Sequence, residues 1–251
     1  MSRGRLLLVP NTLDLGTAPV DIREQIPLGV LQIAAGIAHW LAEDARSTRA
    51  FLKRVHAVQA LAQPLQSIDI RELPRPPKGR ATAGTVPWRE LLGPALAGNS
   101  VGLISEAGLP AVADPGAAAV AAAHALGIPV QPLPGASSLL LALAASGLNG
   151  QSFAFVGYLP QAAAQRASRL KELQSLSRRS GQTQLLIETP YRNAALLRSL
   201  LDTLDADTRV AVSCGLGQPD GWTRSEPVAG WRRQPQAMPE RVPAVFAFLA
   251  A

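Results

Sequence analysis

Cysteine is nearly absent from this sequence, because Cys214 is the single cysteine among 251 residues. One thiol allows no internal disulfide. Aromatic residues make up only 4% of the chain, so Ala, Leu and Val must build the core. Long hydrophobic runs are missing as well, since stretches such as GVLQIAAGIAHWL are shorter than the ~20 residues of a membrane span. The LLLV run near the N-terminus is typical of a strand rather than a secretory signal. We therefore expect a cytoplasmic protein.

Residues that bind metals or act as nucleophiles in common motifs are also scarce. The three histidines, His39, His56 and His124, are far apart, and Cys214 has no Cys or His nearby. Because a metal site needs several such ligands together, we expect no metal. The chain has no GxxxxGK(S/T) motif and no GxGxxG after a strand, which argues against a nucleoside triphosphate as ligand. A GxSxG nucleophile elbow is missing too.

The charge balance is basic, with a net charge of +6 and a pI of about 10.4. A basic surface can bind phosphate backbones, but Arg- and Ala-rich sequences are often basic without such a role. Residues 71–89 concentrate basic side chains among Pro and Gly, which predicts a mobile loop. Its Arg75, Lys78 and Arg80 would contact RNA phosphates or simply be solvated. The charge by itself does not decide whether the chain binds nucleic acid.

The first half of the chain begins with a predicted strand and helix. Residues 5–10 form a short apolar run typical of a strand. Apolar residues recur at helical spacing within 28–41, whose last residues are expected to form a second strand. Ser47 or Thr48 is then expected to cap a short helix.

A second group of elements follows a strand at 101–105. Asp114 stands where a helix N-cap is expected, and Pro115 suits the first helical position because proline has no N–H to lose. The Ala-rich run after it is expected to end at Gly127, and 128–133 is a further strand. This alternation of strands and helices predicts a mostly parallel α/β sheet.

Next, Ser137 or Ser138 is expected to cap an apolar helix that stops at Gly147. The pattern then changes near Asn149 and Gly150. The later segments predict a second α/β domain with a mixed sheet. Its expected strands are 152–160, 183–189, 209–216 and 242–250, and its expected helices are 161–179 and 190–204. We therefore predict two α/β domains, 1–149 and 150–251.

Two loops of small residues, 105–116 and 134–138, follow predicted strands. In open α/β sheets, ligands bind beyond the carboxyl ends of the strands. Small residues let a ligand approach the backbone closely, and carboxylates suit hydroxyls, amines or positive charge. Gly and Pro could instead serve only tight turns. Two such loops in successive units, each followed by a helix, favour a ligand site.

Five motifs occur in register with a known family. They are LAEDARSTRAFL (41–52), SEAGLPAVADPG (105–116), PGASSLLLALAASGL (134–148), FAFVGYLP (153–160) and ETPYRNAALL (188–197). Together they resemble the tetrapyrrole (corrin/porphyrin) methylase family. Within it, the chain is most similar to the branch of ribosomal RNA small subunit methyltransferase I, over roughly residues 5 to 250.

The resemblance implies S-adenosylmethionine as methyl donor, bound in a cleft between two α/β domains, and a homodimer. The site residues that it implies come from both halves of the chain. They are Pro10, Ser105, Glu106, Ala107, Leu109, Pro110, Asp114, Ser137, Ser138, Tyr158, Leu159, Glu188, Thr189, Ser213, Cys214 and Gly215. In methyl transfer the sulfonium is the leaving group, so the protein mostly positions the two reactants.

The acceptor side departs from the family pattern. The branch carries a Gly-Asn-rich loop after the first strand, where this chain has NTLDLGTAPVDIRE, and a His-rich stretch that residues 66–81 lack. Methylation of a ribose 2′-hydroxyl in ribosomal RNA is therefore one interpretation. A tetrapyrrole precursor or other small acceptor is another, and a donor-binding protein without transfer activity is a third.

The acidic pair Glu43 and Asp44 belongs to the first of the five motifs. These carboxylates could bind or orient the acceptor, or one could act as a base for a hydroxyl that must lose its proton. They could equally be a charged loop beside a helix N-terminus, where acids are favourable. We take both as candidate catalytic residues.

Overall fold

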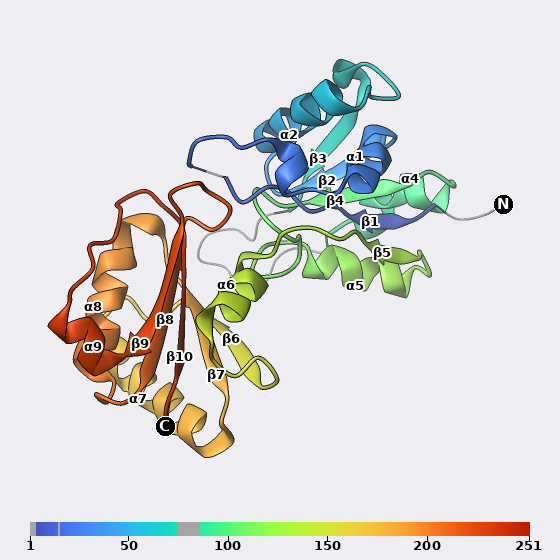
Figure 1. The fold of residues 1–251 in the computed structure, drawn as a ribbon. Helices are drawn as coiled ribbons and strands as arrows, with labels where there is room; N and C mark the ends of the chain where they lie inside the picture. Colours follow the sequence, from blue (N-terminus) through green and yellow to red (C-terminus); the bar gives the residue numbers. More distant parts are fainter. Residues whose placement is uncertain (1–3, 15, 75–85) are drawn as a thin grey trace. The chain divides into compact units, whose positions relative to one another are not determined.

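The structure is a computed structural model that describes residues 4–14, 16–74 and 86–251. The described residues form two compact units: unit 1 comprises those from 4–14 and 20–136, and unit 2 comprises residues 16–19 and 137–251. Within the described residues, each unit has its own five-stranded sheet (Figure 1). The division falls at Ala136 rather than at the predicted 149, because the helix after Ser137 packs on the second sheet.

Unit 1 alternates short strands with helices. Its strands are β1 (Leu6–Leu8), β2 (His39–Ala42), β3 (Asp69–Glu72), β4 (Val101–Ile104) and β5 (Val130–Pro132). Its α-helices are α1 (Leu28–Ala35), α2 (Ala45–Val58), α3 (Trp88–Leu91), α4 (Gly93–Leu96) and α5 (Ala117–Ala125). Its 3-10 turns are η1 (Ile22–Glu24) and η2 (Leu65–Ser67). Of the predicted basic loop 71–89, residues 75–85 lie outside the described part of the chain.

The sheet of unit 1 has the order β3-β2-β4-β1-β5, and all of these pairings are parallel. Successive residues of a strand pack into two different hydrophobic cores. Leu7 and Trp40 pack with residues of α1 and α2, whereas Leu6 and Leu41 pack with residues of α4 and α5. Helices therefore cover both faces, as parallel sheets require (Figure 1).

Unit 2 begins with α6 (Ser138–Ser146). Its strands are β6 (Phe153–Gly157), β7 (Thr183–Ile187), β8 (Arg209–Cys214), β9 (Trp222–Pro227) and β10 (Ala244–Leu249). Its other helices are α7 (Ala163–Ser180), α8 (Asn193–Thr203) and α9 (Val228–Arg233), with a 3-10 turn η3 (Pro190–Arg192).

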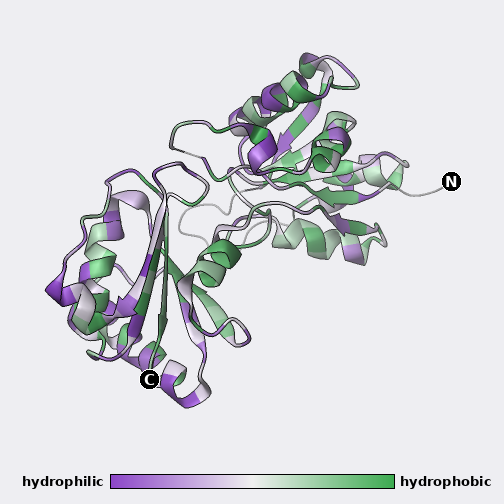
Figure 2. Cartoon of the chain, viewed as in Figure 1, coloured by the Kyte–Doolittle hydropathy of each residue, from purple (hydrophilic) through white to green (hydrophobic). Residues whose placement is uncertain are grey.

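The sheet of unit 2 is mixed, with the order β6-β7-β10-β8-β9. β6 and β7 are parallel, whereas β10 runs antiparallel to both β7 and β8. Phe246 and Phe248 pack with α7, α8 and α9, and Val245 and Ala247 pack with α6. Figure 2 shows α6 as a largely hydrophobic helix, which begins and ends with serine. The predicted α/β class, with one mostly parallel and one mixed sheet, is confirmed.

Two predicted helix starts are wrong, whereas the start predicted at Ser137 or Ser138 is confirmed in position. Helix α2 is capped by Asp44, whose Oδ1 accepts the Ser47 N–H at 2.6 Å, rather than by Ser47 or Thr48. Helix α5 has Gly116 at its N-cap rather than Asp114, because the loop before it continues for two more residues. Ser137 occupies the N-cap of α6, but its side chain makes no capping hydrogen bond.

The predicted helix ends at Gly127 and Gly147 are confirmed, but some strands and helices were missed. Gly127 and Gly147 both adopt positive φ at helix C-termini, where glycine carries no steric penalty. Strand β9 and helix α9 were not predicted, and neither were β3, α3 and α4, of which β3 and α3 overlap the two ends of the predicted loop 71–89. The reason is that β9 is a polar edge strand (WTRSEP) and α9 has only six residues, so neither shows a clear hydrophobic period.

Candidate functional site

Three loops of unit 1 leave one edge of its sheet. β4, β1 and β5 are neighbours and run parallel, so the chain leaves all three at the same side. The loops are residues 105–116 after β4, 9–14 after β1 and 133–136 after β5. We call this side the carboxyl edge of unit 1. Both predicted small-residue loops begin at strand ends, where ligands of open α/β sheets bind.

Asn11 ties the first of these loops to the second. Its Nδ2 donates to the carbonyls of Ser105 at 3.1 Å and Glu106 at 2.9 Å. Its backbone N–H and C=O form a small antiparallel bridge with Gly108. Because Asn11 is only 5% exposed, these bonds are shielded from water. The loop after β1 and the loop after β4 therefore form one hydrogen-bonded structure.

The loop after β4 has an unusual backbone. Gly108 and Gly116 have φ of 65° and 132°, and Ala111 and Ala113 both have φ of 65°. Glycine adopts such angles freely, whereas an alanine in the left-handed region costs roughly 1–2 kcal/mol. Strain of this kind is kept where the surrounding structure imposes it, and it is frequent at ligand sites. The loop is therefore held in shape by its packing rather than by local preference.

Pro10 packs directly against the Pro-Gly loop that follows β5. A Cβ on Gly135 would lie 2.4 Å from both Cβ and Cγ of Pro10, which is far inside contact distance. Only glycine fits this position, because the proline ring is rigid. The predicted site residue Pro10 thus sits against the loop that leads to Ser137.

Ser105 supplies an unsatisfied polar group at this edge. The residue is 2% exposed, and its Oγ has no hydrogen-bond partner among the described residues. An unpaired buried hydroxyl costs roughly 1–3 kcal/mol. A ligand with a polar edge at this position would satisfy it. The other predicted residues of the same loop, Ala107, Leu109 and Pro110, are half-buried or buried.

Three carboxylates interact electrostatically at the carboxyl edge. Burial, followed by the charges of Glu43 and Glu106, raises the pKa of Asp114 from 3.8 to about 7. Below that pH, Asp114 is a neutral hydrogen-bond donor, and above it the cluster gains a negative charge. Such a cluster stabilises a cation bound nearby.

The candidate catalytic pair divides into two structural roles. Asp44 caps α2, and its carbonyl also accepts the hydroxyls of Ser47 and Thr48. Glu43 follows β2, and its Oε2 accepts the backbone N–H of Glu106 at 3.1 Å. Glu43 therefore positions the loop after β4, while Asp44 supports a helix start. Their catalytic role stays a prediction.

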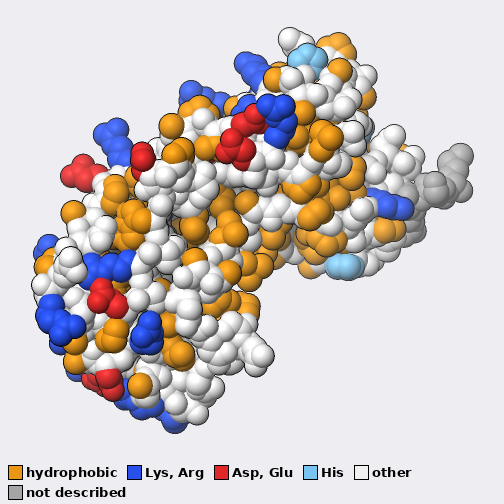
Figure 3. All heavy atoms as spheres, in the orientation of Figure 1, with side chains coloured by type: hydrophobic (Ala, Val, Ile, Leu, Met, Phe, Trp, Pro, Cys, Tyr) orange, Lys and Arg blue, Asp and Glu red, His pale blue; other side chains and the backbone are white. Residues whose placement is uncertain are grey.

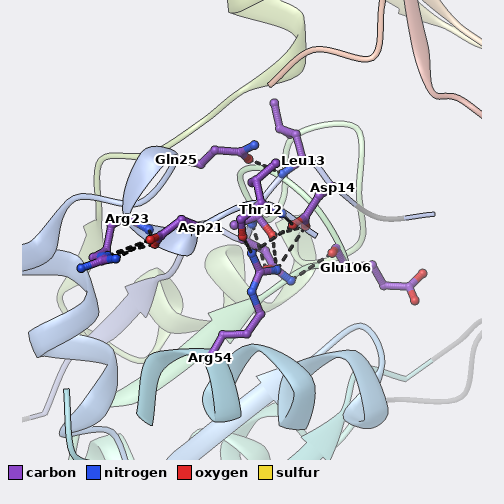
Figure 4. Close-up of polar contacts among 10 residues, drawn as sticks. Thr12, Leu13, Asp14, Asp21, Arg23, Gln25, Arg54 and Glu106 are labelled. Atoms are coloured by element: carbon purple, nitrogen blue, oxygen red, sulfur yellow. Dashed lines mark hydrogen bonds and ion pairs between the residues drawn. The ribbon is translucent and has the colours of Figure 1, made fainter. Parts of the chain in front are cut away.

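A partly buried ion pair, which the sequence did not reveal, lies beside these loops. Figure 4 shows Arg54 reaching from α2 to Thr12 and Asp14. Its Nη1 donates to Thr12 Oγ1 at 2.9 Å, and its Nη2 donates to Asp14 Oδ2 at 2.9 Å. Nη2 also donates to the carbonyl of Val20 at 2.8 Å. The only sequence cue is an acidic residue in the loop that follows the first strand.

Ser137 and Ser138 lie at the start of α6, and the other seven predicted residues of unit 2 lie at one edge of its own sheet. β6, β7 and β8 point in the same direction, because β10 is antiparallel to both β7 and β8. Tyr158 and Leu159 follow β6, and Glu188 and Thr189 follow β7. Ser213 and Cys214 end β8, and Gly215 follows it. Tyr158 is 57% exposed, whereas Leu159 is part of the core.

Several polar groups of this edge are already bonded within unit 2. Glu188 Oε1 accepts the Thr189 N–H at 2.7 Å and forms an ion pair with Arg192 at 2.7 Å. Ser213 Oγ is 2.9 Å from Thr223 Oγ1. Cys214 is 1% exposed, and burial raises the pKa of its thiol. This cysteine is a core residue rather than a nucleophile.

The described residues show neither a metal cluster nor a membrane span. That part of the chain contains no group of three or more His, Cys, Asp or Glu residues that could hold a metal ion. Among the same residues, no helix has both the length and the hydropathy of a membrane span. On the face drawn in Figure 3, Lys and Arg side chains are interspersed with Asp and Glu.

Known proteins resemble the chain in both sequence and fold. Ribosomal RNA small subunit methyltransferase I of Pseudomonas aeruginosa is 39% identical over 132 residues, which are 53% of this chain and 45% of that protein. The protein of the same name from Bacillus subtilis is 30% identical over 210 residues, covering 84% of this chain and 63% of that protein. The chain thus spans about half the length of the curated relatives it matches.

The fold has a similar counterpart among solved structures. Uroporphyrin-III-C-methyltransferase from Thermus thermophilus matches 98% of this chain and 92% of that chain with a TM-score of 0.51, at 20% sequence identity. This likeness concerns the fold alone. The sequence model of the tetrapyrrole (corrin/porphyrin) methylase family matches residues 34–228, which is most of the chain. The chain therefore belongs to the tetrapyrrole (corrin/porphyrin) methylase family.

Proposed function

We propose that this chain is an S-adenosylmethionine-dependent methyltransferase that methylates a ribose 2′-hydroxyl of ribosomal RNA. Membership of a methylase family and the names of the most similar relatives support the reaction class. The observation that carries the proposal is the carboxyl edge of unit 1. There the family motif SEAGLPAVADPG forms a strained loop around the unpaired hydroxyl of Ser105.

The residues of this edge fit the proposed donor. S-adenosylmethionine presents a sulfonium, an amine, a carboxylate and a ribose. The buried Ser105 hydroxyl can bond to one of its polar edges, and the carboxylates of Glu106 and Asp114 suit its positive charge. Small side chains along 105–116 let the backbone approach a ligand closely.

The proposed reaction depends mainly on how the chain positions the donor and the acceptor. When bound, S-adenosylmethionine supplies an activated methyl group on sulfur, which is also the leaving group. The chain must hold this donor in line with the acceptor oxygen and exclude water. A ribose hydroxyl must also lose a proton, so a base is required at the acceptor. Glu43 is the candidate, because the Asp44 carboxylate caps α2.

The choice of ribosomal RNA rests on the relatives, whose names specify that substrate. The basic composition of the chain supports it, because Arg and Lys neutralise phosphates. Contributions of the unit 2 residues to the donor site, and of the basic loop to RNA binding, are part of the proposal. A homodimeric state and a cytoplasmic location stay predictions.

The test combines donor titration with acceptor pools. Purified protein is titrated calorimetrically with S-adenosylmethionine and with its demethylated product. It is then incubated with methyl-labelled donor and separate pools of small ribosomal subunits, free ribosomal RNA and tetrapyrrole precursors. We expect binding of both compounds, and label in one of the RNA pools.

The other outcomes separate the alternatives. Label in the tetrapyrrole pool alone would replace RNA as acceptor while keeping the methyltransferase assignment. Donor binding without label in any pool would favour a binding protein that lacks transfer activity. Absence of binding to folded protein would overturn the proposal.

A further inference from the structure

The Arg54–Asp14 pair is partly buried and makes several bonds, as does the Arg192–Glu188 pair of unit 2. The Asp14 side chain is 7% exposed and that of Arg54 is 28% exposed. Burial by itself would raise the pKa of Asp14. However, hydrogen bonds from Arg54, Thr12 and the Val20 N–H outweigh it and hold the pKa below its usual value. Asp14 is therefore a fixed negative charge that needs its partner.

Both terminal nitrogens of Arg54 point into the protein. Nη1 bonds to Thr12 and Asp14, and Nη2 bonds to Asp14 and the Val20 carbonyl. Asp14 Oδ2 also accepts the Val20 N–H at 3.0 Å. Arg54 thus joins the start and the end of the segment between Asp14 and Val20. With its donors used in this way, Arg54 is poorly placed to bind an RNA phosphate.

A chain of hydrogen bonds connects Arg54 to the carboxyl edge. Thr12 follows Asn11 directly, and the Thr12 N–H donates to Asn11 Oδ1 at 2.9 Å. This bond orients the Asn11 amide so that its Nδ2 faces the carbonyls of Ser105 and Glu106. The segment 11–14 is therefore fixed to α2 on one side and to the loop after β4 on the other.

We propose that Arg54 is a positioning residue for donor binding. Through Asp14 and Thr12 it holds Asn11 in place, and Asn11 in turn holds the backbone of Ser105 and Glu106 in the conformation that receives the donor. Arg54 does not touch the donor itself. The inference rests on the proposed function, since it assigns a role toward the donor of that reaction.

Releasing the segment would lower the population of binding-competent protein. If 10% of molecules keep the competent loop, the apparent Kd rises about tenfold. Arg54→Met removes all the bonds of the guanidinium but leaves the Asp14 charge buried, so it can also impair folding. The double variant Arg54→Met/Asp14→Asn removes both charges and avoids an unpaired carboxylate.

The experiment compares four variants with the wild-type protein. They are Arg54→Met, Arg54→Met/Asp14→Asn, Arg54→Lys and the control Arg23→Met. Arg23 pairs with Asp21 nearby, but its side chain is 65% exposed. Each protein is titrated calorimetrically with S-adenosylmethionine, melted, and analysed by hydrogen exchange of peptides that contain the Asn11 and Gly108 amides.

We expect the double variant to melt near the wild-type temperature, to bind the donor about tenfold more weakly, and to exchange the Gly108 amide faster. Arg54→Lys keeps the charge without the planar fork, so its Kd should fall between those of the wild type and the double variant. Arg23→Met should match the wild type in all three measurements.

Two results would overturn the inference. One is a wild-type Kd in the folded double variant. The other is unchanged exchange at Gly108, which is measured without any donor. If the wild-type protein itself binds no donor, the proposed function fails, and this exchange measurement decides separately whether Arg54 controls the loop. Equal weakening by Arg23→Met would also count against a specific role of Arg54.

Discussion

Replacing Ser105 by alanine should make the protein more stable and bind its donor less tightly. The Ser105 hydroxyl is buried without a partner in the described chain, so unfolding lets it bond to water. Ser105→Ala removes this penalty, and we expect the free energy of unfolding to rise by about 1 kcal/mol. If the hydroxyl bonds to the donor, the variant loses one neutral hydrogen bond, and the Kd should rise roughly two- to tenfold.

Ser225 provides a matched control in unit 2. Its Oγ is also buried without a hydrogen-bond partner among the described residues, but it lies on the edge strand β9, where it pairs with Ala211 rather than with a predicted donor residue. Ser225→Ala should therefore gain similar stability and leave the Kd unchanged. Urea unfolding measures the first effect, and calorimetric titration with S-adenosylmethionine measures the second.

The reasoning would be refuted by equal donor affinity in Ser105→Ala and the wild type. It would be refuted as well if both variants weakened donor binding to the same extent, because the effect would then not depend on the position of the hydroxyl. A loss of stability in Ser105→Ala would show that the hydroxyl has a partner in the free protein.

Substitutions at three further positions test individual parts of the carboxyl edge. Because burial raises the pKa of Asp114 from 3.8 to about 7, wild-type stability should fall as pH rises between these values, and Asp114→Asn should remove that fall in urea unfolding. Gly135→Ala should cost roughly 1–3 kcal/mol of unfolding free energy, because the new Cβ would overlap the Pro10 ring. Asp44→Ala should cost about 1 kcal/mol and Asp44→Asn much less, since Asn also caps helices.

Each of these predictions would be contradicted by a particular result. A wild-type pH profile in Asp114→Asn would assign the titration to another group. Full stability in Gly135→Ala would mean that the two loops can separate freely. For Asp44, lost turnover in the stable Asn variant would restore its candidate catalytic role.

Local patterns predicted the architecture well. The strand at 101–105, the Ala-rich helix after it and the glycine at 127 follow from hydrophobic runs and helix-end preferences. The start of α5 was misplaced because Ala111 and Ala113 adopt positive φ, which their own preferences oppose. Packing imposes that conformation, since Gly116 lies against Leu103 and Ala111.

The connections within the candidate site were harder to predict. Family motifs located the loop 105–116, but they did not indicate what holds it. Arg54 and Asp14 are 40 residues apart in sequence, and no local period relates them. The bonds from Asn11 to Ser105 and Glu106 likewise depend on β1 lying beside β4. Such long-range contacts follow from topology rather than from local sequence.

The most direct test of the central claim is the chemical identity of the methylated product. Small ribosomal subunits are incubated with the protein and methyl-labelled S-adenosylmethionine, and their RNA is digested to nucleosides and analysed by mass spectrometry. The account predicts label in a 2′-O-methylated nucleoside, and none when the protein is omitted. Label on a base, or no label in RNA while a tetrapyrrole precursor is methylated under the same conditions, would contradict it.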